Sequence, residues 1–174
     1  YREQLVNWVH ESDVDAIGVL GLDGIYDESG TLDRKRTQVY VSNDYVLDVC
    51  KTSPQLLPVC SINPERKDAL DELARVVAAG SIAIKALPNS QDFDPADERF
   101  RTFFERMAKH NIPFLTHTSF EHTIPPVNQT WGQPGRLKLA LECGATVIAA
   151  HCAGAGTAQR RGVAGAGRGE DRVH

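Results

Sequence analysis

The sequence has few of the features that mark secreted, membrane or nucleic-acid-binding proteins. Its 174 residues include four cysteines with no C-x-x-C pair, so we predict reduced thiols and no disulfide framework. No stretch approaches the roughly 18 continuous apolar residues of a membrane span, and no signal peptide is recognisable. A net charge of −4 gives no electrostatic attraction to nucleic acid or to an anionic membrane. These absences lead us to expect a cytoplasmic protein with a small-molecule substrate as its partner.

The composition is that of a globular domain with a real core. Apolar residues make up 41% and charged residues 24% of the chain, both ordinary for a folded protein. The sequence does not start with methionine, so we expect it to be a piece of something longer. Residues 1–152 are predicted to form one domain. Residues 153–174 are rich in glycine, alanine and arginine and cannot bury an apolar face, so we predict a disordered tail.

Apolar runs alternate with amphipathic helical patterns along the domain. This order, with short connections, predicts an α/β fold with a parallel sheet. The runs are continuously apolar, which is typical of strands covered on both faces. An open sheet of this kind has two unpaired edges, so we expect a homo-oligomer or aggregation unless they are covered. The predicted strands are residues 16–23, 56–62, 81–86, 112–118 and 145–150.

The helical segments carry start signals and apolar faces. Two Asx-Pro pairs, Asn63-Pro64 and Asp94-Pro95, are predicted to cap helices with proline at the first helical position. Residues 87–93 are predicted to be a loop. The predicted buried faces are Val46, Val49 and Cys50 after Asn43; Leu70, Leu73, Ala74 and Val77 in the third helix; Phe100, Phe103, Phe104 and Met107 in the fourth; and Leu137, Ala140 and Leu141 in the fifth.

Three of the predicted strands end in residues that can carry chemistry. Lys85, His117 and His151 each follow an apolar run directly. The carboxyl ends of parallel strands meet at one edge, where α/β folds place their active sites, so we expect these side chains to converge. Neutral imidazole is a good ligand for zinc, and two histidines on neighbouring strands would fix two positions of a metal site.

Ordinary structural roles compete with each of these interpretations. Either histidine could simply be hydrogen-bonded at a strand–loop junction. Lys85 could form a salt bridge at the sheet edge, contact an anionic group or be carbamylated and bridge two metals. Cys152 is interpreted as a small core residue in preference to a thiolate ligand.

Polar residues in the loops beside these strand ends are candidates for substrate contact. Loops above the strand ends usually set specificity in α/β enzymes. The candidate substrate-binding residues are Asn89, Gln91, Thr118, Glu121 and His122.

Four segments together resemble a known family. They are Val-Cys-Ser-Ile-Asn-Pro at 59–64, Ala-Gly-Ser-Ile-Ala-Ile-Lys at 79–85 with Pro-Asn-Ser-Gln at 88–91, Pro-Phe-Leu-Thr-His-Thr at 113–118 and Val-Ile-Ala-Ala-His at 147–151. In order and spacing the chain resembles the amidohydrolase-related metal-dependent (β/α)8-barrel hydrolases, a branch that also contains decarboxylases of aromatic and unsaturated acids. The resemblance implies a partial TIM barrel whose five strands are the second to sixth of the full barrel.

The resemblance also implies roles for the residues at the strand ends. Family members hold a divalent metal, zinc being our expectation, with a His-x-His pair ending the first strand, histidines ending the fifth and sixth, and an aspartate ending the eighth. His117 matches the fifth-strand ligand and His151 the sixth-strand ligand. Lys85 falls at the end of the fourth strand, where some members carry a carbamylated lysine. We therefore assign catalytic roles to Lys85, His117 and His151.

The chain departs from the family pattern in two places. It contains no His-x-His, and its tail has no apolar strand that could carry the final aspartate, which would be the expected proton acceptor. We expect a hydrolase acting on a C–N or C–O bond of an amide, ester or lactone. The alternatives are a metal-dependent decarboxylase of a small unsaturated or aromatic acid and, from another class, a non-catalytic barrel remnant.

Overall fold

The computed structural model describes residues 2–153 and places five parallel strands in one sheet. The strands follow one another in space as they do in sequence, so every connection between them is a crossover to the neighbouring strand. In the sheet register, Lys85 pairs with Leu115 and His117 pairs with Ala150. The carboxyl ends of β3, β4 and β5 therefore lie at the same edge of the sheet. The predicted parallel α/β sheet is confirmed. The strands are β1 (Ile17–Leu20), β2 (Leu56–Ser61), β3 (Ala83–Ala86), β4 (Phe114–His117) and β5 (Val147–Ala150).

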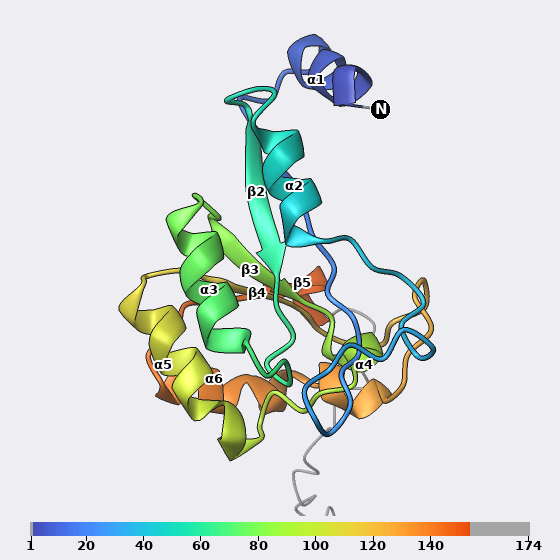
Figure 1. Cartoon of the computed structure of the whole chain (residues 1–174), viewed down its shortest axis with the longest axis vertical. Coiled ribbons are helices and arrows are strands. Elements are labelled where there is room, and N and C mark those ends of the chain that lie inside the picture. Colours follow the sequence, from blue (N-terminus) through green and yellow to red (C-terminus); the bar gives the residue numbers. More distant parts are fainter. Residues whose placement is uncertain (1, 154–174) are drawn as a thin grey trace, which may run out of the picture.

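Helices follow the strands and cover one face of the sheet. Figure 1 shows α3, α5 and α6 together on that side, with α2 beside β2 and α1 beyond the amino end of β2. The helices are α1 (Arg2–Glu11), α2 (Asn43–Cys50), α3 (Ala69–Ala78), α4 (Pro88–Gln91), α5 (Arg101–Lys109) and α6 (Lys138–Glu142). Single 3-10 turns form η1 (Glu98–Phe100), η2 (Gln129–Gly132), η3 (Pro134–Leu137) and η4 (His151–Ala153).

The main core lies between the sheet and these helices. Phe104 is fully buried, and its ring meets Phe103 and Phe114 edge to face, with centroids 5.8 and 5.3 Å away. Ile84 and Cys60 of the neighbouring strands pack into the same cluster. Each aromatic side chain buries a large apolar area, so these rings contribute strongly to the stability of the core.

The opposite face of the sheet is far less covered. Leu20 is 50% exposed and Ile148 is 45% exposed, and Leu115 between them is half-buried. Because Leu115 pairs with both Lys85 and Ile148, Lys85 lies on this same face. The expectation of strands covered on both faces therefore does not hold for β1 and β5, which are the two edge strands. Association through these edges stays a prediction.

The third helix begins later than its sequence signal indicated. Asn63 does not cap it: its Oδ1 accepts the N–H of Glu65 in a local turn, and its Nδ2 donates to carbonyls at Gly24 and Gln91. The chain makes turns until α3 starts at Ala69. Because the helix begins later, its buried face differs from the predicted one. Leu70 is 40% exposed and Ala74 is exposed, whereas Leu73 and Val76 are buried.

The segment before β5 shows a similar shift. It opens with the 3-10 turn η3, which has three residues per turn, before α6 continues with α-helical geometry. Because the 3-10 turn has fewer residues per turn than an α-helix, it rotates the residues that follow it. Leu139 therefore faces the core and is 4% exposed, whereas Leu141 faces solvent and is 59% exposed. The predicted burial of Leu141 is wrong for this reason, while that of Leu137 and Ala140 is confirmed.

Other local predictions can be compared with the structure directly. All four cysteines are free thiols, although only Cys60 is buried and Cys152 is exposed. The predicted loop at 87–93 contains the single helical turn α4. None of the helices within residues 2–153 has the length and hydropathy needed to cross a bilayer. The predicted disordered tail lies, apart from Ala153, outside the described residues.

Candidate functional site

The structure brings two of the predicted residues into contact at the carboxyl ends of β4 and β5. His117 is the last residue of β4, and His151 follows β5 directly. Their ring centroids lie 4.8 Å apart, with the ring planes tilted by 56°. His117 is only 7% exposed, whereas His151 is exposed. The pair therefore has one buried and one open imidazole.

The backbone at His151 has an unusual conformation. His151 and Cys152 have φ values of 62° and 49°, in the left-handed region that residues other than glycine rarely adopt. Two such residues in succession cost of order 1–3 kcal/mol each and persist only when surrounding structure imposes them. The sharp turn stops β5 and leaves the His151 ring against that of His117.

His117 has oxygen atoms facing both ring nitrogens. Its Nδ1 lies 3.4 Å from Oε2 of Glu121, and its Nε2 lies 3.3 Å from the carbonyl oxygen of Phe120. Burial lowers the pKa of His117, and the neighbouring charges of Glu121 and Lys85 act in opposite directions on it. The ring is therefore held towards the neutral form, which is the form that can bind a metal.

Glu121 is a buried carboxylate held in its ionised form. Burial alone would raise the pKa of Glu121, but N–H groups of Ile124 and Thr123 and the nearby His117 outweigh it and lower the pKa. Both backbone N–H groups donate to Oε1, which leaves Oε2 towards the histidine. The glutamate was predicted as a substrate contact; the structure places it beside His117, and its contact with substrate stays a prediction.

Lys85 supplies a half-buried cation on the same side of the sheet. Burial lowers the pKa of Lys85, and the charge of Glu121 partly offsets this. Within residues 2–153 its ammonium has no carboxylate at ion-pair distance, so the salt bridge considered from the sequence is not formed there. An unpaired, partly desolvated ammonium is suited to contact an anionic group.

The other predicted contact residues occupy different positions. Asn89 and Gln91 are buried: the Asn89 amide donates to the carbonyl of Ser119, and the Gln91 amide to that of Asp23. The buried Thr118 hydroxyl donates to the carbonyl of Ala150, which ties β4 to β5. His122 is exposed in the loop, with its ring beside that of Phe120. Direct substrate contact by these four side chains stays a prediction.

Two residues that matter for this site carried no usable sequence signal. Gln129, in η2, forms hydrogen bonds with Glu121 and Asn89, and Gly132 packs so closely that a Cβ there would lie 2.4 Å from the Ser119 carbonyl. Both lie in an irregular loop where neither periodicity nor a motif distinguishes them.

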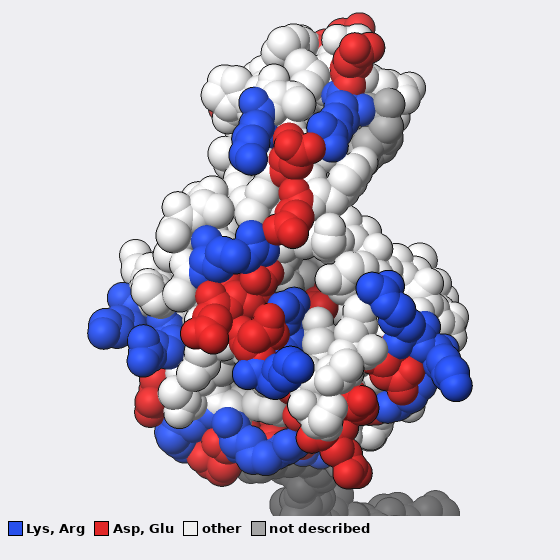
Figure 2. Space-filling model, viewed as in Figure 1, with Lys and Arg blue, Asp and Glu red and all other residues white. Residues whose placement is uncertain are grey.

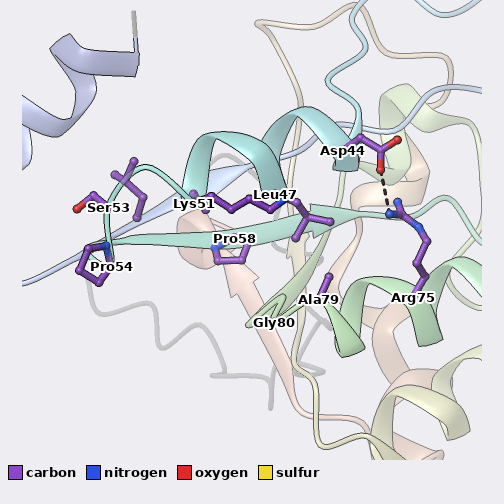
Figure 3. Close-up of a pocket in the computed structure, with 11 residues that line it drawn as sticks. Asp44, Leu47, Lys51, Ser53, Pro54, Pro58, Arg75, Ala79 and Gly80 are labelled. Atoms are coloured by element: carbon purple, nitrogen blue, oxygen red, sulfur yellow. Dashed lines mark ion pairs between the residues drawn. The ribbon is translucent and has the colours of Figure 1, made fainter.

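A hollow of about 520 Å³ lies elsewhere, between α2, β2 and α3. Figure 3 shows Asp44 and Arg75 paired across one end of it, 2.9 Å apart, with Leu47, Pro58 and Ala79 along its walls. It contains no histidine and lies on the helix-covered side, away from the strand ends. Around it, basic and acidic side chains are interleaved on the surface (Figure 2). This hollow therefore lacks the imidazole groups found at the strand ends.

Comparisons with known proteins place this geometry in a family. The model of the amidohydrolase family matches residues 23–169 of the chain. The chain belongs to the amidohydrolase family. The match covers every strand from β2 to β5 together with His117 and His151, and its last residues lie outside the described part of the chain. A search of curated proteins found no significant match.

Solved structures show the fold of this amidohydrolase. An uncharacterised TIM-barrel protein from Bordetella bronchiseptica aligns with a TM-score of 0.63 at 18% identity, over 84% of this chain and 50% of that one. A 2,6-dihydroxybenzoate decarboxylase from Rhizobium aligns with a TM-score of 0.57 at 16% identity, over 83% and 51%. The chain thus spans about half the length of the structures it matches, and its sheet is a partial TIM barrel.

The residues at the strand ends can be compared with the donor set of a metal centre. Catalytic zinc sites take three protein ligands, with nitrogen and carboxylate oxygen preferred. His117 and His151 can occupy two of these positions because their rings are adjacent and that of His117 is held neutral. Within the described residues, no group of three or more His, Cys, Asp or Glu side chains is arranged to hold a metal. The strand ends therefore bring two imidazoles together, and their role as metal ligands stays a prediction.

Removing the half-buried charge of Lys85 is expected to stabilise the protein. We expect Lys85→Met to raise the free energy of unfolding at pH 7 by about 0.5–2 kcal/mol. Because the pKa of Lys85 is lower in the folded protein than its unfolded value of 10.5, the unfolded chain binds more protons than the folded one between these two pKa values. The destabilisation by charged Lys85 is therefore complete at neutral pH and is lost as the pH rises above 10.5. Urea denaturation of wild type, Lys85→Met and the exposed control Lys109→Met measures this. Equal effects of the two substitutions would contradict the expected desolvation cost.

Proposed function

We propose that the strand ends of this chain form part of the active site of a metal-dependent hydrolase. The reaction would break a C–N or C–O bond in a small-molecule amide, ester or lactone. The observation that carries the proposal is the contact between His117 and His151 at adjacent strand ends, with His117 held neutral. A bound divalent ion, with zinc as our choice for imidazole ligands, would supply Lewis acidity and lower the pKa of water there.

The residues of the chain have separate tasks in this proposal. His117 and His151 bind the ion, one from a buried and one from an open position. Lys85, half-buried and on the same face, binds an anionic group of the substrate. By family resemblance, a His-x-His pair and an aspartate complete the site. The chain has no His-x-His and spans about half of the matching structures, so the activity belongs to the complete barrel.

A decarboxylase is the second candidate. In this proposal the Lys85 ammonium, unpaired within residues 2–153, would hold a substrate carboxylate; one structure with the same fold is a 2,6-dihydroxybenzoate decarboxylase. The two reactions differ in their products. A hydrolase incorporates oxygen from labelled water into its product, and a decarboxylase releases carbon dioxide without doing so. Mass spectrometry of product and headspace gas distinguishes them.

Metal binding tests the proposal most directly. We expect zinc to bind the purified chain, and His117→Ala or His151→Ala to weaken binding by more than about 100-fold, since losing a ligand costs more than losing a residue that orients one. Isothermal titration calorimetry measures the affinity, and elemental analysis measures the metal content. His122→Ala is the matched control, because His122 is exposed in the adjacent loop.

Two outcomes would contradict the proposed metal site. One is an absence of zinc binding by the folded wild-type chain. The other is equal weakening by His122→Ala and by the two strand-end substitutions, which would indicate non-specific surface binding. Either result would favour a non-catalytic remnant of the barrel.

A further inference from the structure

Glu121 uses its two carboxylate oxygens for different purposes. Oε1 accepts the backbone N–H groups of Thr123 and Ile124 and so fastens the side chain to the loop that follows β4. Oε2 lies 3.4 Å from Nδ1 of His117. Oε1 thus accepts two hydrogen bonds from the backbone, and Oε2 is the oxygen that faces the imidazole of His117.

A second residue fixes the backbone of Glu121. The side-chain amide of Gln129 accepts the Glu121 N–H at 2.9 Å and donates to the Glu121 carbonyl at 2.8 Å. The Oε1 of Gln129 also accepts from Nδ2 of Asn89 in α4, at 2.9 Å. A continuous set of hydrogen bonds therefore runs from α4, after β3, through Gln129 in η2 to the backbone of Glu121.

The surroundings of His117 force a choice of tautomer. A neutral imidazole has one N–H, but oxygen acceptors face both nitrogens, the carboxylate at Nδ1 and the Phe120 carbonyl at Nε2. The Nε2 contact has hydrogen-bond geometry and the Nδ1 contact is at ion-pair distance, so it is the charge of Glu121 that favours a proton on Nδ1: a hydrogen bond to an ionised acceptor is roughly twice as strong as one to a neutral carbonyl. The proton therefore belongs on Nδ1, and the lone pair of Nε2 is left facing an oxygen.

We propose that Glu121, held by Gln129, is a positioning residue that fixes His117 as the Nδ1–H tautomer and presents Nε2 as the ligand atom. Metal-binding histidines generally donate their second N–H to a carboxylate or carbonyl, which orients the ring. A cation at Nε2 would also remove the unfavourable approach of the lone pair to the Phe120 carbonyl. The ligand part of this inference rests on the proposed function, whereas the tautomer part concerns the metal-free chain.

Substitution of Glu121 by glutamine tests the tautomer. The glutamine Oε1 can still accept from Thr123 and Ile124, so its NH2 group turns towards Nδ1, which must then accept a hydrogen bond. We expect the metal-free wild type to show Nδ1–H and Glu121→Gln to show Nε2–H in the ¹⁵N shifts of the His117 ring, read at a pH where the ring is neutral. Glu105→Gln, which removes an exposed glutamate from α5, should leave the ring unchanged.

Zinc affinity provides the second measurement. Loss of a residue that orients a ligand typically costs about 10–100-fold in metal affinity, and we expect that loss for Glu121→Gln and none for Glu105→Gln. If Glu121→Gln does not fold, Gln129→Ala keeps the test possible: with Glu121 released, the Nδ1–H tautomer should give way to a mixture. A wild-type ring found as Nε2–H overturns the inference. An unchanged tautomer in folded Glu121→Gln or Gln129→Ala overturns it as well.

The two readouts separate this inference from the proposed function. If the tautomer changes as expected but the wild type binds no zinc, the positioning role is supported and the metal-dependent hydrolase fails. If zinc binds through His117 and His151 but the tautomer does not respond to Glu121→Gln, the positioning role fails and the hydrolase remains.

Discussion

Replacing Asp23 with alanine is expected to lower the free energy of unfolding by about 3–5 kcal/mol, the cost of breaking a buried charged network. Asp23 is 3% exposed and lies just beyond β1. Its Oδ1 accepts from the N–H of Gly24 and the hydroxyl of Tyr26, and its Oδ2 from the N–H of Asn63 and from Arg66. One side chain thus joins the segments that follow β1 and β2 at the carboxyl edge of the sheet.

Burial raises the pKa of Asp23 in spite of these donors, so the ionised carboxylate is itself costly in this position. Its removal is still worse, because the buried N–H groups of Gly24 and Asn63 would lose their acceptor, and within residues 2–153 Arg66 would keep only Asp68 as an anionic partner. Urea denaturation of Asp23→Ala measures the loss. Asp71→Ala, which removes an exposed aspartate from α3, is the control and should change stability by less than about 0.5 kcal/mol. A decrease of less than about 1 kcal/mol in the free energy of unfolding of Asp23→Ala would contradict this stabilising role of Asp23.

Leu139→Ala is expected to destabilise the domain by about 2–5 kcal/mol, the usual cost of a buried leucine. Leu139 is 4% exposed and packs in the cluster between the helices and the sheet, with Phe104 and Phe114 among its members. The substitution removes buried methyl groups and leaves a cavity that surrounding aromatic rings fill only in part.

Leu141→Ala provides a closely matched comparison. It makes the same chemical change two residues away in the same helix, but Leu141 is 59% exposed. We expect it to cost less than about 0.5 kcal/mol. The helical pattern of the sequence predicted the opposite order for this pair. Thermal and chemical denaturation of both variants therefore tests the helix phase set by η3, and similar losses for the two would contradict it.

Much of the fold was accessible from local patterns. Each predicted strand has a counterpart, because a buried strand needs a continuous apolar run and few other segments of this chain contain one. The alternation of such runs with amphipathic helices also determined the parallel order. Helix starts were less predictable: Asn63 has the residue type of a cap, but its side chain binds carbonyls at Gly24 and Gln91.

The two histidines could be located from the sequence for a simple reason. They follow apolar strands directly, and parallel strands place their carboxyl ends at one edge, so strand order alone brought His117 and His151 together. The polar residues around them could not be assigned in this way. Whether Gln91 faces a substrate or the interior depends on Asp23, a residue 68 positions away whose carbonyl accepts its amide proton.

Local sequence thus accounts for the strands, their order and the histidines at their ends, because backbone geometry and apolar periodicity act over a few residues. Tertiary structure decided the surroundings of those histidines. It left Lys85 without a carboxylate partner in the described residues and placed Glu121 beside His117. It also used Asn89 to hold a loop. These outcomes depend on burial and on hydrogen bonds between distant segments, which no short window of sequence contains.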